Sequence, residues 1–176
     1  MSLATLTSVD EYLSTTYRPD RDYVDGMVLE RNLGEWNHSR LQTVLLTYLV
    51  VREAQWGILA VAEQRVQVAP TRFRIPDVSV LLGTEPDGQI IRRPPFLCVE
   101  ILSKDDTMTQ MQERIHDYLS FGVPYVWVVD PRTKRAYNFT QSGMHEVKDG
   151  LLSTANPDIQ VPLSEIFASD FPATNT

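Results

Sequence analysis

The chain has 176 residues, 43% of them hydrophobic and 22% charged, an ordinary balance for one globular domain. Its formal net charge of −7 argues against a protein that coats nucleic acid through a broad basic surface, because phosphate contacts need Lys and Arg. The single cysteine, Cys98, excludes an intrachain disulfide. The start of the chain lacks the pattern of a signal peptide, and no stretch approaches the roughly 18 apolar residues of a membrane span. We therefore expect one cytoplasmic domain over residues 1–176, with an ordered core of about 5–170 and no membrane contact.

The N-terminal part of the chain predicts a short helix, a hairpin and a longer helix. Ser8 and Glu11 have the spacing of a capping box, so a helix should begin near residue 9 and end before Pro19. Residues 22–30 predict strand, with a turn at 25–26. Asn37 is the expected N-cap of a helix that ends near Gly57. Its apolar stripe recurs at helical spacing: Leu41, Val44, Leu45, Tyr48 and Leu49.

The rest of the chain alternates strands with one long helix. Residues 59–69, 75–82 and 96–102 each predict a strand. Asp105 or Asp106 is the expected N-cap of a helix that ends at Gly122 and shows one apolar stripe: Met108, Met111, Ile115, Tyr118 and Leu119. Strands at 125–129, 135–140 and 145–147, a last helix capped by Ser164 and a frayed tail after Phe171 should follow. The strand, helix and strand over 96–129 predict a parallel βαβ unit.

Glu100 is a carboxylate in the middle of the apolar strand 96–102. An unpaired buried charge is costly, so this side chain must be paired, protonated or bound to a metal ion. Strand alternation places Cys98, Glu100 and Leu102 on one face and the intervening residues on the other. A buried ion pair with an arginine is the alternative to a functional acid.

Asp77 enters the apolar strand 75–82 directly after Pro76. A turn aspartate after proline is the plain structural interpretation. If Asp77 and Glu100 meet in the fold, their carboxylates repel each other, and a divalent cation is the natural neutraliser. Oxygen ligands favour Mg²⁺ or Mn²⁺ over zinc or copper. Such an ion can activate water and stabilise charge on a phosphoryl group.

The acids and several short segments together resemble a known family. Pro76-Asp77 followed by Glu100 in an apolar strand resembles the PD-(D/E)xK nuclease motif. The ordered segments at 23–26, 38–39, 75–78, 99–103 and 122–131 are similar to the Uma-two family of restriction-endonuclease-like proteins, over roughly residues 5–165. The resemblance implies an α/β fold: a restriction-endonuclease-like mixed β-sheet flanked by helices, with β-hairpins. It also implies that Asp77 and Glu100 bind Mg²⁺ or Mn²⁺.

The resemblance extends to further residues of the site. Asp22 occupies a place that is often acidic in the family, where it is either a third acid near the ion or a solvated strand end. The motif lysine is replaced by Leu102; in similar proteins it migrates to the following helix, where this chain has Arg114. Arginine can clamp a phosphate but is a poor proton acceptor.

Three more polar residues are candidates for substrate contacts. Lys104 either replaces the lysine or lies on a solvated loop, and Gln112 can reach the site from the same helix as Arg114. His38 either faces the site or is a partly exposed residue of the first helical turn.

Two functions remain open at this point: a Mg²⁺-dependent endonuclease acting on DNA, weakened or altered by loss of the lysine, and a catalytically inactive module of the same fold that binds nucleic acid or a protein. We also expect a homodimer.

Overall fold

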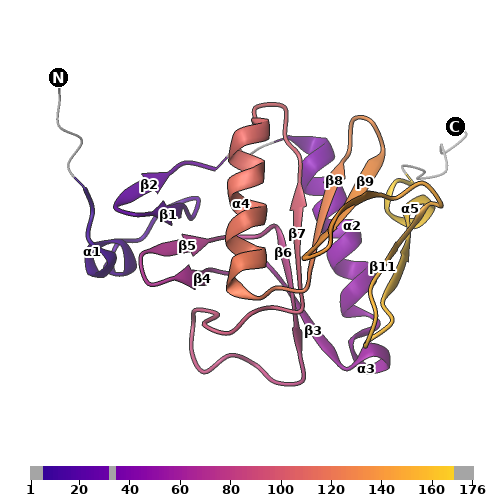
Figure 1. The fold of residues 1–176 in the computed structure, drawn as a ribbon, viewed down its shortest axis with the longest axis horizontal. Helices are drawn as coiled ribbons and strands as arrows, with labels where there is room; N and C mark the ends of the chain where they lie inside the picture. The colour runs from indigo at the N-terminus through magenta and orange to yellow at the C-terminus, as the bar shows by residue number, and fades with distance from the viewer. Residues whose placement is uncertain (1–5, 32–34, 169–176) are drawn as a thin grey trace, which may run out of the picture.

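The computed structural model describes residues 6–31 and 35–168 (Figure 1). The expected frayed tail and the ends of the expected core, residues 5, 169 and 170, lie outside these ranges. The helices are α1 (Val9–Ser14), α2 (Trp36–Val50), α3 (Glu53–Trp56), α4 (Met108–Phe121) and α5 (Leu163–Ile166). The strands are β1 (Asp22–Val24), β2 (Met27–Leu29), β3 (Ile58–Ala62), β4 (Val66–Ala69), β5 (Arg72–Arg74), β6 (Val78–Leu82), β7 (Leu97–Ile101), β8 (Tyr125–Asp130), β9 (Arg135–Thr140), β10 (Gly143–Glu146), β11 (Leu151–Ser153) and β12 (Gln160–Pro162).

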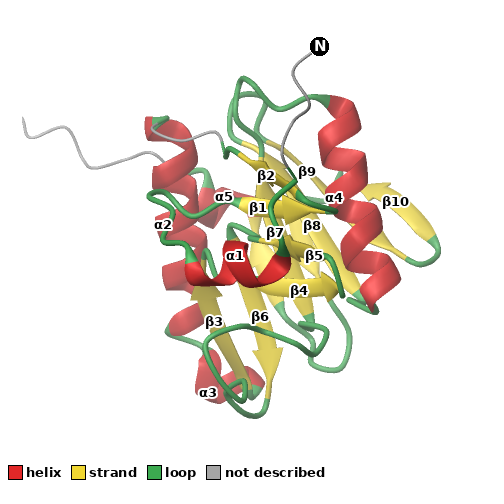
Figure 2. Cartoon of the chain, turned by 90° about the vertical axis from the view of Figure 1, so that its left-hand side faces the viewer, coloured by secondary structure: helices red, strands yellow, loops and turns green. Residues whose placement is uncertain are grey.

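A six-stranded mixed sheet forms the centre of the molecule, in the order β10-β9-β8-β7-β6-β3. β7 and β8 are parallel, with Glu100 beside Val128, and the other neighbours pair antiparallel. The connection from β7 through α4 to β8 confirms the predicted βαβ unit, and the helix-flanked mixed sheet confirms the predicted fold class. α2 and α4 lie on opposite sides of this sheet (Figure 2).

The alternation of β7 decides which helix each side chain meets. Leu97, Val99 and Ile101 belong to the core under α2. Cys98 is fully buried in the core under α4, where Leu102 also packs. The predicted division of faces is therefore correct, and it sends the Glu100 side chain toward α4.

A second sheet packs beside the first, in the order β2-β1-β5-β4. α1 covers it with Tyr12, whose ring stacks on Tyr23 at 4.9 Å and lies 5.3 Å from Phe73. The hairpin β11–β12, which the sequence pattern did not indicate, adds Leu152 and Val161 to the core under α2. No helix within the described residues is long and apolar enough to cross a membrane.

Two predicted continuous elements are divided in the structure, and one predicted strand is shorter than expected. The strand expected at 59–69 becomes β3 and β4, which join different sheets, because the backbone turns at Glu63 with φ +50°. The strand expected from residue 75 begins only at Val78, after Pro76, which cannot donate a ladder hydrogen bond. The helix expected to reach Gly57 ends at Val50, and the separate α3 ends at that glycine, whose φ is +64°.

The predicted caps were wrong at three of the helix starts. α2 begins after Glu35 rather than Asn37, and α5 begins after Pro162 rather than Ser164. α4 is capped by Thr107, which forms a capping box with Gln110. Neither aspartate caps α4; Asp106 instead accepts hydrogen bonds from the backbone N–H and hydroxyl of Ser103. Met108 was also wrongly placed in the buried stripe, since 74% of it is exposed in the first turn.

Candidate active site

Asp77 lies just before β6, where the chain passes between α2 and β7. Only 4% of its side chain is exposed. Its Oδ2 accepts a hydrogen bond from the backbone N–H of Ile101 at 2.7 Å and lies 3.2 Å from Nε2 of His38. Its Oδ1 accepts a hydrogen bond from Arg31 at 3.0 Å. Asp77 is therefore a fixed anion at the junction of α2 and the central sheet.

Glu100 projects from β7 toward α4, with 3% of its side chain exposed. Its Oε1 accepts a hydrogen bond of 2.5 Å from the hydroxyl of Tyr118, and its Oε2 lies 3.3 Å from Arg114 Nη1. Burial raises the pKa of Glu100 to about 7, against the opposing effect of Arg114, while Asp77 raises it further. The ion pair that was the alternative interpretation of Glu100 is present, alongside the second acid.

Asp77 and Glu100 both line one cavity of about 10 Å³. Its walls come from the segment just before β6, the end of β7 and the loop after it, the segment after β2, and the first halves of α2 and α4. The lining residues are Arg31, His38, Asp77, Glu100, Ile101, Ser103, Asp106 and Arg114. A space of this volume is about the size of one water molecule.

Arg114 reaches Glu100 from α4. Its guanidinium lies 3.3 Å from Glu100, 3.5 Å from Asp106 and 3.7 Å from Asp22. Three carboxylates therefore share this one cation. With 17% of its side chain exposed, Arg114 is not a solvated helix residue.

Asp22 is buried, so the interpretation of a solvated strand end is wrong. Its Oδ1 accepts a hydrogen bond from the backbone N–H of Ile75, and its Oδ2 accepts one from Arg74, both at 3.1 Å. Asp22 is absent from the walls of the cavity. These contacts make it a neighbour that holds Arg74 and approaches Arg114.

His38 faces the site and is 8% exposed, so it is not the partly exposed residue of the alternative interpretation. Burial, the largest single influence, lowers its pKa, but the hydrogen bond and charge of Asp77 together outweigh burial and raise the pKa above its ordinary value. A protonated His38 donates to Asp77 and helps to hold that carboxylate in place.

The two remaining candidates lie outside the cavity. Gln112 and Lys104 are both exposed, and Lys104 contacts Glu35 through its backbone N–H. None of the residues lining the cavity is a lysine.

Three residues of the site were not identified from the sequence. Arg31 follows β2 without any periodic signal, and its link to Asp77 spans 46 positions. Asp106 was taken for a helix cap, and Tyr118 for a purely apolar member of the α4 stripe. Only Tyr118 carries a local signal, since a buried tyrosine hydroxyl needs a partner.

The carboxylates of the site fit a hard divalent cation with few protein ligands. Within the described ranges, no group of three His, Cys, Asp or Glu side chains forms a metal cage. Mg²⁺ often takes one or two carboxylates and completes its shell with water and phosphate oxygens. Asp77 and Glu100, together at one polar cavity, match that donor set.

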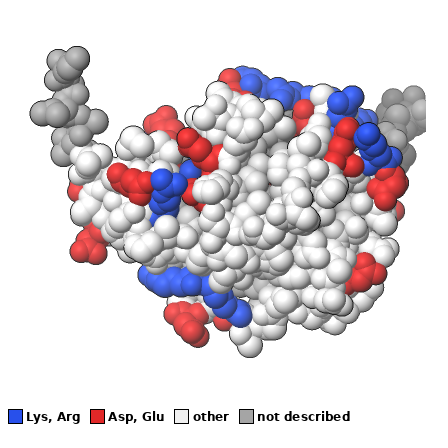
Figure 3. Space-filling model, in the orientation of Figure 1, with Lys and Arg blue, Asp and Glu red and all other residues white. Residues whose placement is uncertain are grey.

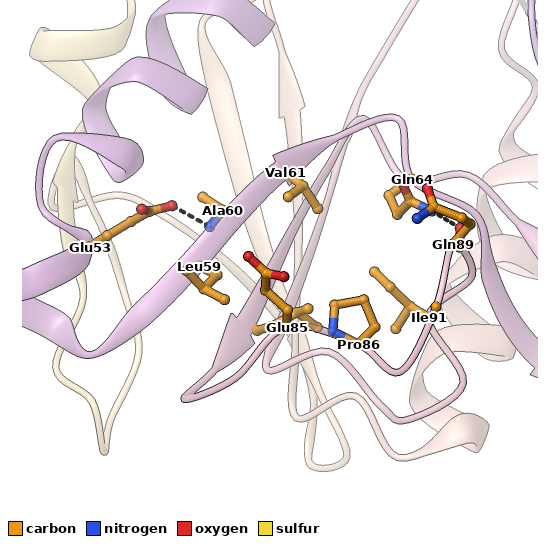
Figure 4. A pocket seen from close by; sticks show the side chains of 11 residues that line it. Glu53, Leu59, Ala60, Val61, Gln64, Glu85, Pro86, Gln89 and Ile91 are labelled. Atoms are coloured by element: carbon orange, nitrogen blue, oxygen red, sulfur yellow. Dashed lines mark hydrogen bonds between the residues drawn. The ribbon is translucent and has the colours of Figure 1, made fainter.

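A larger cavity of about 340 Å³ lies elsewhere, between β3 and the loop at 83–91 (Figure 4). Leu59, Val61 and Ile91 give it an apolar floor, and Glu53 uses its carboxylate to accept a hydrogen bond from the backbone N–H of Ala60 at 2.8 Å. It includes none of the candidate residues.

On the face shown in Figure 3, Lys and Arg stand in separate groups with acidic residues among them. This distribution agrees with the net charge of −7 and favours local rather than broad contacts with an anion.

The mixed sheet, its flanking helices and the buried acid pair at the ends of β6 and β7 define a restriction-endonuclease-like α/β domain. The model of the Uma2 family, described as "Putative restriction endonuclease", matches residues 9–168. The chain belongs to this family, which is the Uma-two family of the sequence resemblance.

A solved structure of similar fold is a "putative nuclease belonging to DUF820 from Anabaena variabilis ATCC 29413". It is 22% identical, with a TM-score of 0.78 over 90% of this chain and 96% of that chain, and it supports the fold. A cryo-EM structure of a DrdV–DNA complex is 13% identical, with a TM-score of 0.36 over 77% of this chain and 14% of that chain, too weak to carry an argument. No curated protein matches the chain.

Proposed function

We propose that the chain is a metal-dependent endonuclease that hydrolyses phosphodiester bonds of DNA, with Asp77 and Glu100 as ligands of Mg²⁺ or Mn²⁺. One observation carries the proposal: two buried carboxylates from neighbouring strands line a single polar cavity together with two guanidinium groups. Burying two acids together with their cations is costly, and clusters of this kind are found at functional sites. Membership of the Uma2 family supports the same function.

Each side chain has a distinct part in this proposal. A bound Mg²⁺ or Mn²⁺ supplies a Lewis acid for the phosphoryl group and acidifies a water molecule. Arg31 and Arg114 can pair with phosphate oxygens through planar, bidentate hydrogen bonds. His38 orients Asp77. We leave Asp22 out of the ligand set because it does not line the cavity that Asp77 and Glu100 share.

The missing lysine favours a second candidate, a nuclease-fold module that binds DNA or a protein without cleaving. The cavity offers Arg114 and Arg31 where a lysine would position or activate water. An arginine keeps its proton at any ordinary pH, so it cannot act as the base.

Cleavage of duplex and single-stranded DNA in Mg²⁺ and in Mn²⁺ tests the two functions. Asp77→Asn and Glu100→Gln should abolish both cleavage and Mn²⁺ binding measured by calorimetry. Asp87→Asn, an exposed carboxylate in the loop at 83–91, should change neither. Thermal unfolding of each variant checks that the fold survives. DNA binding with no cleavage of any form would select the binding module instead.

A further inference from the structure

Each proposed metal ligand already forms an ion pair with an arginine side chain. Arg31 lies 3.0 Å from Asp77, and Arg114 lies 3.3 Å from Glu100. The two arginine side chains are 8% and 17% exposed, so water screens these pairs only weakly. A divalent ion that enters the cavity alone meets two guanidinium charges as well as two carboxylates, which reduces its attraction to the site.

One guanidinium nitrogen of Arg31 is not used in the contact with Asp77. This atom, Nη1, is buried and has no hydrogen-bond partner among the described residues, and Oε1 of Glu63 lies 3.8 Å from it. A buried donor without a partner is costly, because it has lost its hydrogen bonds to water and gained none in the protein. An anion with several acceptor oxygens would satisfy it, and a phosphodiester matches the fork of donors on arginine.

We infer that Arg31 and Arg114 hold the acids in the absence of ligands, so that the metal ion and a DNA phosphodiester bind this site with positive coupling. The phosphate attracts the guanidinium groups, which leaves the oxygens of Asp77 and Glu100 to the ion. The ion in turn neutralises the acids and leaves the arginines to the phosphate. This inference rests on the proposed function. Coupling between two ligands is typically about 5–150-fold and is the same in both directions.

Calorimetry with Mn²⁺ measures the coupling without any need for turnover. Mn²⁺ is titrated into the protein alone and into the protein saturated with a phosphorothioate duplex that resists hydrolysis. For the native chain we expect the Mn²⁺ affinity to rise at least about fivefold when DNA is present.

Arg31→Gln isolates the role of the guanidinium on Asp77. Without its competitor, Mn²⁺ should bind the DNA-free variant at least about fivefold more tightly than it binds the native protein. DNA should then add little further affinity. Arg31→Lys keeps the charge and should retain weak Mn²⁺ binding in the absence of DNA. Arg92→Gln removes an exposed charge outside the site and should behave as the native chain does.

Three results would overturn the inference, and they separate it from the proposed function. Equal coupling in Arg31→Gln and the native chain would assign the effect to the general attraction of DNA for Mn²⁺. Mn²⁺ binding that DNA does not change would reject the coupling and leave the nuclease proposal standing. No Mn²⁺ binding with or without DNA would reject both. If Arg31→Gln is unfolded by circular dichroism, Arg31→Lys decides: its DNA-free Mn²⁺ affinity must stay within about twofold of the native value.

Discussion

At the scale of single residues, burial controls the chemistry of Glu100. Its carboxylate loses nearly all contact with water on β7, and the hydrogen bond from Tyr118 and the charge of Arg114 only partly compensate. A proton is therefore held more tightly in the folded chain than in the unfolded chain, where the pKa of a glutamate is near 4.5.

The pH dependence of unfolding should report this shift. Because the folded pKa of Glu100 is raised, its favourable contribution is complete below about pH 4.5 and is lost as the pH rises through about 7. We expect the free energy of unfolding to fall by up to ~3 kcal/mol over that window in the native chain.

Urea denaturation in EDTA from pH 4.5 to 8 checks this expectation. Glu100→Gln should lose the part of the decline that Glu100 causes. His38, whose pKa is also raised, contributes a decline of the same sign in both proteins, so the difference between the two curves reports mainly Glu100. If the free energies of unfolding of the native chain and of Glu100→Gln change in parallel with pH, the raised pKa of Glu100 is contradicted.

At the scale of elements, buried ion pairs fasten the small sheet to α4. Arg74 on β5 lies 3.1 Å from Asp22 on β1 and 2.7 Å from Asp117 on α4. Since Asp22 also approaches Arg114, the same network helps to position the arginine of the site.

Removal of Arg74 should be strongly destabilising. Arg74→Met removes the hydrogen-bonded cation of the buried Asp22, leaves it only Arg114 at 3.7 Å, and should lower the free energy of unfolding by about 3–5 kcal/mol. Arg72→Met is the matched control, because Arg72 also pairs with Asp117 but has 35% of its side chain exposed. Arg72→Met should lower the free energy of unfolding by only about 1 kcal/mol. Urea denaturation of both variants measures the two costs. Equal costs would show that burial of the pair is not what matters.

The two glycines that end helices should respond differently to alanine. Gly57 ends α3 at φ +64° with open space around it, so Gly57→Ala should cost about 1–2 kcal/mol. Gly122 ends α4 at φ +105°, and a Cβ there would lie 3.3 Å from Cγ of Pro94. Gly122→Ala should therefore cost more than Gly57→Ala in thermal unfolding. A larger cost for Gly57→Ala than for Gly122→Ala would show that the loop carrying Pro94 moves aside at little energetic cost.

At the scale of the whole molecule, a homodimer stays a prediction. The edge strand β10 is exposed along its length, and 56% of Met144 on it is accessible. Light scattering should give a mass of about twice the chain mass of 20.1 kDa. If β10 forms the contact, Met144→Lys should lower the measured mass toward that of a single chain. A mass near 20.1 kDa for the native chain at high concentration would exclude the dimer.

The sequence by itself determined the elements whose signals are local. Periodicity indicated α4 and the strands β7 and β8, because a buried face needs apolar residues at a fixed spacing. The cost of an acid in an apolar strand identified Glu100, and the family resemblance pointed to Arg114 on the following helix. Asp77 was identified by its neighbours and by the family resemblance.

The tertiary structure decided what depends on contacts between distant segments. The turn at Glu63 divides a run of alternating residues between two sheets, which alternation cannot express. Asp106 binds Ser103 instead of capping α4, a choice between two local hydrogen bonds that the loop geometry decides. Arg31 and Asp77 stand 46 positions apart and meet only because α2 and the central sheet bring them together. Ion pairs of this kind have no sequence period, since their energy depends on distance and burial in the folded chain.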